Sequence, residues 1–231
     1  YFSAGSYFQE QIAGITFYEL VENLEKNFEE QKADLIDKLK TLMGYIFRPE
    51  NLFVSVTADE KGYEGMEQRI ASMKEYLHKD TLELGGIQYR LEQKNEAFKT
   101  AGQVQYVATC GNFRSAGFDY TGSLRILKMI LNYDYLWMNL RVKGGAYGCM
   151  SGFKRTGEAY LVSYRDPNLS KTLETYKGIK DYLNQFDCPE RDMTKYIIGT
   201  ISELDTPLNP SAKGSVSLNA YFSGVPSSLI V

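Results

Sequence analysis

The spacing of hydrophobic positions predicts a long amphipathic helical region near the start of the chain. Apolar side chains recur at steps of three, four or seven residues: Val21, Leu24, Phe28, Leu35, Leu39, Leu42 and Ile46. Glu and Lys occupy many of the intervening positions, so the opposite face is charged. We predict helical structure over residues 16–47, ending at Arg48-Pro49 because the residue before a proline disfavours the helical conformation.

Three shorter patterns follow. Residues 52–57 (LFVSVT) are rich in β-branched and aromatic side chains and predict a buried strand. Residues 64–77 place apolar side chains on one stripe and predict a helix. Residues 80–100 are polar and contain Gly85-Gly86, which makes them the best candidate for a linker.

The second part of the chain begins with a predicted strand at 104–108 and a loop at 111–122. Residues 124–140 are apolar nearly all round, which predicts a deeply buried helix. Residues 146–153 and 158–164 alternate and are joined by four residues that include a glycine, as in a β-hairpin.

Helices are predicted over 170–183, from Asp187 to Leu204, and from Asn209 toward Phe222. Strands therefore cluster in hairpins and helices gather in runs, which indicates an α+β fold. We predict one unit over residues 1–80, a linker over 81–101 and a second unit over 102–231.

The charge distribution agrees with two units but does not require them. The net charge is −3 and the pI is about 5.4, which argues against general binding of nucleic acid. Residues 1–100 carry 12 Lys and Arg against 18 Asp and Glu, whereas residues 101–231 carry 14 against 11. Ordinary scatter among solvated faces is the alternative explanation. No run of 18 apolar residues lacks a polar break, so a membrane span is not expected.

The three cysteines, Cys110, Cys149 and Cys188, are too few and too scattered for a disulfide framework. We expect free thiols that pack as small apolar side chains in a reducing compartment, either the cytoplasm or another such as a mitochondrial matrix.

The segment RVKGGAYG (Arg141–Gly148) carries the strongest candidate chemistry. It lies where the predicted buried helix turns into the hairpin, and its two adjacent glycines permit positive φ angles and close backbone approach. Arg141 and Tyr147 could then reach the same space and offer a guanidinium and a phenolic hydroxyl. Such a pair suits holding a peptide backbone or stabilising an oxyanion.

Structural explanations exist for the same residues. Gly144 and Gly145 also suit a helix C-cap, and Arg141 could be a last-turn cation favoured by the helix dipole. The glycines do not form a phosphate-binding loop, which requires another spacing and precedes a helix. Arg165-Asp166-Pro167 is expected to be a structural turn in which Arg165 pairs with a carboxylate, and Asp134 is expected to face an arginine or a helix end.

A metal site within this chain is not expected. His78 is the sole histidine, and its place at the end of an amphipathic helix favours a surface position. No cysteine pair has the two-residue spacing of structural zinc sites.

Three blocks in order resemble the C-terminal half of presequence-protease-type peptidases, in the pitrilysin and insulin-degrading-enzyme family of zinc metallopeptidases. They are RVKGGAYG, VSYRDPN (162–168) and KYIIGTISELDTP (195–207), and the resemblance covers roughly residues 103–224. NLFVSVTAD (51–59) also resembles the strand that closes an earlier domain of that family.

The resemblance implies helices layered over a mostly antiparallel sheet, as in processing peptidases. It implies a zinc-dependent endopeptidase that encloses unstructured peptides between two halves, with zinc held by an N-terminal His-x-x-Glu-His motif that this chain lacks. It assigns Arg141 and Tyr147 as the catalytic and substrate-binding residues of this half. The expected partners are the peptide substrate and the N-terminal half, and this chain alone should bind no zinc and be inactive. The alternative is a non-catalytic scaffold or binding homologue of the same fold with a degenerate zinc half.

Overall fold

The computed structural model describes residues 2–80, 85–86, 88–226 and 228, which group into two compact units. The sheet unit comprises Tyr1–Ile12 and Tyr89–Asp205, and the helical unit comprises Ala13–Gln88 and Thr206–Val231. The division differs from the predicted domain boundaries, which stay a prediction. Part of the predicted linker, at 81–84 and 87, lies outside the described residues, and its other residues up to 100 have no regular secondary structure.

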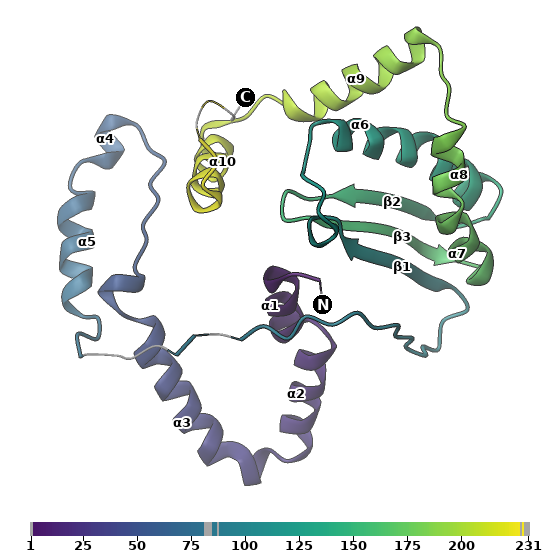
Figure 1. Ribbon diagram of the computed structural model, residues 1–231. Coiled ribbons are helices and arrows are strands. Elements are labelled where there is room, and N and C mark those ends of the chain that lie inside the picture. The colour runs from purple at the N-terminus through teal and green to yellow at the C-terminus, as the bar shows by residue number, and fades with distance from the viewer. Residues whose placement is uncertain (1, 81–84, 87, 227, 229–231) are drawn as a thin grey trace. The chain divides into compact units, whose positions relative to one another are not determined.

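The sheet unit contains an antiparallel sheet that confirms the α+β prediction (Figure 1). Its strands are β1 (Gln105–Asn112), β2 (Gly148–Phe153) and β3 (Glu158–Asp166), in the order β1-β3-β2. The predicted hairpin is present as β2 and β3, and Gly157 in their connection has φ +95°. Strand β1 continues four residues beyond its predicted end at Ala108, because it pairs with β3 up to Asn112.

Several helices belong to the same unit as the sheet. They are α6 (Ser123–Ile130), two π-helical segments (Leu131–Tyr135 and Trp137–Val142), α7 (Ser170–Lys177), α8 (Ile179–Asn184) and α9 (Glu190–Leu204). Helix α1 (Ala4–Ala13) begins in this unit. The predicted helices at 170–183 and after Asp187 are thus present, the first as two segments that meet at Gly178. Helix α6 contacts β2 and α9, and α7 contacts β1.

The core of the sheet unit lies between the helices and one face of the sheet. It is formed by Val107, Leu131, Leu136, Leu140, Ala146 and Tyr176. The Tyr176 hydroxyl donates to the Val107 carbonyl at 3.1 Å, and burial raises the pKa of Tyr176 to about 12. The buried hydroxyl of Tyr176 therefore has a hydrogen-bond partner, so its burial does not carry the free-energy cost of an unpaired polar group.

The helix over 124–140 was predicted to be deeply buried, and this is wrong for one of its faces. Leu131, Leu136 and Leu140 are at most 2% exposed, whereas Trp137 is 39% and Tyr133 65% exposed. The sheet covers only the side of the helix that faces it. An apolar composition alone does not predict which sides of a helix are buried.

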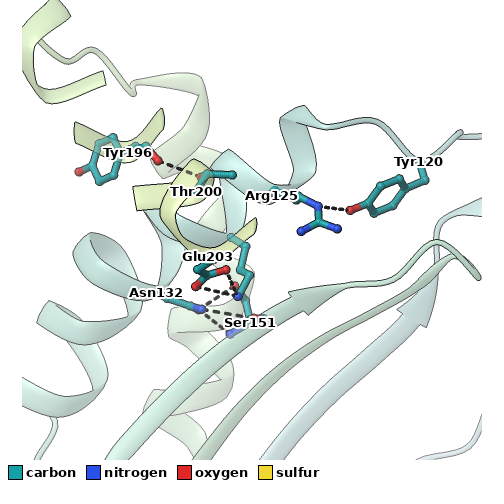
Figure 2. Close-up of polar contacts among 8 residues, drawn as sticks. Tyr120, Arg125, Asn132, Ser151, Tyr196, Thr200 and Glu203 are labelled. Atoms are coloured by element: carbon teal, nitrogen blue, oxygen red, sulfur yellow. Dashed lines mark hydrogen bonds and ion pairs between the residues drawn. The ribbon is translucent and has the colours of Figure 1, made fainter. Parts of the chain in front are cut away.

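Asn132 ties this helical segment to the free edge of β2 (Figure 2). Its Oδ1 accepts from the Ser151 N–H at 2.6 Å and from the Ser151 hydroxyl at 2.8 Å, and its Nδ2 donates to the Ser151 carbonyl at 3.4 Å. Since β2 has β3 on only one side, the amide of Asn132 satisfies edge groups that a further strand would otherwise bind.

Among the described residues Asp134 forms no ion pair with an arginine, which was one of its two expected neighbours. The Tyr182 hydroxyl donates to its carboxylate at 2.7 Å. Burial and this hydrogen bond raise the pKa of Tyr182. A tyrosine from α8 can serve because a phenol is a good donor to a carboxylate, a pairing between distant segments that sequence spacing does not reveal.

The helical unit contains α2 (Ile15–Lys26), α3 (Phe28–Ile46), the 3₁₀ turn η1 (Pro49–Asn51), α4 (Glu60–Tyr63), α5 (Met66–Glu75) and α10 (Pro210–Ser223). The helical region predicted at 16–47 is confirmed but is broken at Asn27, whose side-chain amide donates to Asn23. Asn209 caps α10 by accepting from the Ala212 N–H at 2.8 Å. Across the described residues, no helix is both long and apolar enough to cross a membrane.

The strand predicted at 52–57 is wrong. These residues have no regular secondary structure, and Phe53 packs on Tyr221 and Phe222 of α10 with ring centroids 5.2 and 4.8 Å apart. A strand requires a neighbouring strand to bind its N–H and C=O groups, and within the described part of the chain this segment pairs with none.

Candidate functional site

The helix that carries Arg141 ends in a tight turn that only glycines can form. Gly145 has φ +79°, in the left-handed region. A Cβ on Gly144 would lie 2.5 Å from the Leu140 carbonyl oxygen and 2.9 Å from that of Asn139. The Gly145 N–H donates to the Arg141 carbonyl at 3.0 Å, so the glycines do form the helix C-cap that one explanation foresaw.

The turn brings Arg141 and Tyr147 together on an exposed surface. The Arg141 guanidinium lies 4.3 Å from the ring centroid of Trp137, one helical turn earlier, and 5.8 Å from that of Tyr147. Tyr147 is 58% exposed, and Arg141 is also exposed. A cation over an aromatic face is attracted by the ring quadrupole, so Trp137 orients the arginine without neutralising it.

Arg165 joins this pair, which the sequence interpretation did not foresee. It was expected to pair with a carboxylate, but no ion pair of Arg165 is found among the described residues. Its guanidinium instead lies 5.4 Å from the ring centroid of Tyr147, and its carbonyl accepts from the Tyr147 N–H at 3.3 Å. We name Arg141, Tyr147 and Arg165, with the ring of Trp137, the arginine–tyrosine corner.

Tyr164 supports the ring of Tyr147 from the sheet. The two rings meet edge to face with centroids 5.6 Å apart. A Cβ on Gly148 would collide with the ring of Tyr164, so the ring can lie across β2 only because position 148 lacks a side chain. Gly148, the last residue of RVKGGAYG, was the signal that a side chain approaches the backbone there.

Asp166 anchors the strand end next to the corner, in agreement with the structural role expected for its turn. It is 1% exposed and accepts from the Ser163 hydroxyl at 2.6 Å, the Thr172 hydroxyl at 2.7 Å and the Asn168 N–H at 2.8 Å. The Asn168 amide in turn donates to the Gly144 carbonyl at 2.6 Å. One hydrogen-bonded network therefore fixes both the glycine turn and the end of β3.

Cys149 lies beside the corner but is not poised as a nucleophile. Burial raises the pKa of its thiol to about 11, although the charge of Arg141 acts in the opposite direction. At neutral pH the thiol is protonated, and a thiol rather than a thiolate is a poor nucleophile. All three cysteines are free, but Cys110 is exposed rather than packed as expected.

A metal centre requires a group of ligand side chains close together in space. Within the described ranges, no group of three or more His, Cys, Asp and Glu side chains could hold a metal ion. His78 is exposed beyond the end of α5, where its backbone N–H donates to the Phe47 carbonyl at 2.9 Å. The arginine–tyrosine corner itself offers hydrogen-bond donation and positive charge.

A cavity of about 640 Å³ lies elsewhere in the sheet unit and does not include the corner. Its apolar lining comes from the helix-facing side of the sheet and from α6 and α8, including Leu127, Leu161, Ile179 and Leu183. No charged side chain of the corner reaches it, so it belongs to the packing between sheet and helices.

Comparison with known proteins decides the family. Residues 95–228 match the family model described as the PreP C-terminal domain. The chain belongs to the presequence protease family. The matched segment includes the whole arginine–tyrosine corner and all three strands, and the resemblance recognised in the sequence is thereby confirmed.

The curated relatives are much longer than this chain. Protein HypA of Clostridium perfringens (strain 13 / Type A) is 42% identical over 94% of this chain and 22% of its own length. Presequence protease 1, chloroplastic/mitochondrial, of Arabidopsis thaliana is 34% identical over 94% of this chain and 20% of its own length. The mitochondrial presequence protease of Kluyveromyces lactis is 25% identical over 90% and 22%. The chain thus spans about a fifth of the length of these relatives.

Proposed function

We propose that this chain is the substrate-binding C-terminal portion of a zinc-dependent endopeptidase that degrades unstructured peptides. The observation that carries the proposal is the arginine–tyrosine corner: two exposed guanidiniums and one exposed phenol around a rigid turn. Membership of the presequence protease family supports a peptidase, and the names of two relatives place those proteins in mitochondria or chloroplasts. We propose a reducing compartment of this kind for the present protein.

In this proposal Tyr147 donates its hydroxyl to the carbonyl oxygen of the scissile peptide bond. The hydrogen bond strengthens as negative charge develops on that oxygen, so it favours the transition state over the bound peptide. The ring contacts Tyr164, Arg141 and Arg165, and these contacts limit its motion before the substrate arrives.

Arg141 holds the peptide backbone next to the scissile bond. Its planar fork can donate two hydrogen bonds to neighbouring carbonyl oxygens, and stacking on Trp137 presets its orientation. The N-terminal half would hold the zinc, and the chemistry supplied there would be activation of a water molecule. The part played by this chain is limited to binding and orienting the peptide and to stabilising its carbonyl oxygen.

Tyr147→Phe in the full-length protein tests the assignment. We expect kcat on an unstructured fluorogenic peptide to fall about 10²–10³-fold while KM changes little, as for the loss of one oxyanion donor. Packing around the ring is kept, so the melting temperature should be unchanged. A variant that retains nearly wild-type kcat would return Tyr147 to a packing role. A wild-type protein that binds peptide without cleaving it would favour the non-catalytic homologue.

The zinc assignment has a separate test. We expect elemental analysis of the isolated 231-residue chain to show far less than one zinc per chain, because it has one histidine and its described residues contain no group of three possible ligands. The full-length protein should carry about one. Stoichiometric zinc in the isolated chain, lost together with peptidase activity on chelation, would contradict the division of roles between the two halves.

A further inference from the structure

Arg165 has an unusual place in the strand that ends at the corner. In the pairing of β1 with β3, Gln105 lies opposite Asp166 and Tyr106 lies opposite Tyr164, so Arg165 has no partner and is the extra residue of a β-bulge. Its φ of +48° is the one positive value for a residue other than glycine in the described part of the chain. A long side chain in the left-handed region is strained, and such strain persists only where its surroundings enforce it.

The bulge changes which way the side chains of β3 point. By simple alternation Asp166 would face away from Ser163, since the two lie three positions apart in the strand. With Arg165 as an extra residue, Asp166 instead lies on the same side as Ser163, where it accepts from Ser163 and from Thr172 of α7. The buried network on the helix side therefore holds the bulge in place and leaves Arg165 on the side of Tyr147.

Two contacts then link Arg165 to Tyr147. The Arg165 carbonyl accepts from the Tyr147 N–H at 3.3 Å, which fixes the backbone of the tyrosine just before β2 begins. The Arg165 guanidinium lies 5.4 Å from the centroid of the same ring. Bulges commonly re-aim a side chain beside a site, and here the re-aimed side chain meets the proposed oxyanion donor.

We propose that Arg165 is a positioning residue that holds the ring of Tyr147 in the orientation its hydroxyl needs. The inference rests on the proposed function of Tyr147 and adds a residue to it. Arg165 acts through the ring and the backbone of Tyr147, whereas Arg141 contacts the substrate. The strained bulge is retained because a regular strand would point Asp166 away from its buried partners and Arg165 away from Tyr147.

The test is a double-mutant cycle in the full-length protein with Arg165→Gln and Tyr147→Phe. Gln keeps an unbranched polar side chain, although a shorter one, and a side chain in the left-handed region, but it removes the charge. We expect Arg165→Gln alone to lower kcat about tenfold, from the loss of a cation–π contact, with KM within about twofold. In the Tyr147→Phe background it should lower kcat no more than about twofold, because no hydroxyl remains to position.

Arg155→Gln is the matched control. Its guanidinium lies 5.3 Å from the ring centroid of Tyr120, a similar cation–aromatic pair in the same unit but outside the corner. This variant should leave kcat unchanged. Arg165→Lys should recover part of the lost rate, because it restores a cation over the ring. Arg165→Gly, which adopts positive φ without strain, should melt no lower than the wild type and still show the reduced kcat.

The remaining outcomes distinguish the positioning role of Arg165 from the proposed function of Tyr147. Equal losses of kcat from Arg165→Gln in both backgrounds would show that Arg165 acts independently of Tyr147 and would overturn the inference. Wild-type kcat in Arg165→Gln, with Tyr147→Phe impaired, would overturn it while leaving the proposed function standing. Wild-type kcat in Tyr147→Phe would overturn both the proposed function of Tyr147 and the inference about Arg165.

Discussion

The two compact units use similar amphipathic patterns with different results. In the sheet unit, the apolar stripe of the helix after α6 meets the sheet, and Leu131, Leu136 and Leu140 are at most 2% exposed. In the helical unit, α2, α3 and α5 contain no buried residue. Leu39 on α3 is 50% exposed in this chain. An apolar stripe in the sequence indicates that one face of a helix packs against something, but it does not identify the segment that packs there.

The difference is also visible in the polar interactions. In the sheet unit, buried Asp166 is bound by three donors from β3, its following turn and α7. In the helical unit, buried Arg48 pairs with Glu50 and Asp80, which are both exposed. The ion pair of Glu22 with Lys26 joins two exposed side chains one turn apart. A buried network specifies one arrangement, whereas an exposed pair contributes little. The candidate site lies in the unit that contains the buried network of Asp166.

The largest expected effect comes from truncating the core of the sheet unit. Leu136 is fully buried, so Leu136→Ala should lower the free energy of unfolding of the 231-residue chain by about 2–5 kcal/mol through lost transfer energy and a cavity. Urea unfolding followed by circular dichroism measures it. A loss below about 1 kcal/mol would show that the core of this unit repacks freely.

Glu158 provides an intermediate effect that depends on pH. Desolvation alone would raise the pKa of its carboxyl, but hydrogen bonds from Lys154, Ser3 and Ser6 outweigh it and lower the pKa to about 2. The carboxylate therefore stabilises the folded state above the ordinary pKa of about 4.5, and this contribution is lost as the pH falls toward 2.

Comparison of the wild type with Glu158→Gln at pH 6 and pH 3 tests this. We expect the variant to be less stable by roughly 1–2 kcal/mol at pH 6, after allowance for solvent screening, and the gap to narrow at pH 3. Glu22→Gln, at the exposed pair with Lys26, is the control and should show little change at either pH. A gap that stays constant with pH would argue against a depressed pKa of Glu158.

The smallest effect is expected from the same leucine-to-alanine change in the helical unit. Leu39→Ala should change the free energy of unfolding of the 231-residue chain by no more than about 0.5 kcal/mol, because the side chain is half exposed. Repeating the measurement in the full-length protein sharpens the comparison. A loss there that approaches that of Leu136→Ala would show that additional polypeptide covers this stripe.

The sequence by itself determined the type and order of most helices and strands, because hydrophobic period, prolines and turn glycines act locally. It also placed Arg141 and Tyr147 on either side of a glycine turn, since two adjacent glycines permit the positive φ angles of a tight turn between a helix and a strand. The family followed from the same blocks of residues and is confirmed by the match to the PreP C-terminal domain.

Tertiary structure alone decided the rest. Residues 52–57 have strand-forming side chains but no strand to pair with in the described chain, and pairing is a property of two segments. Arg165 was expected to bind a carboxylate, yet a bulge set by the buried bonds of Asp166 turns it onto Tyr147. Register, burial and bulges depend on contacts between residues far apart in the chain, and local patterns carry no information about them.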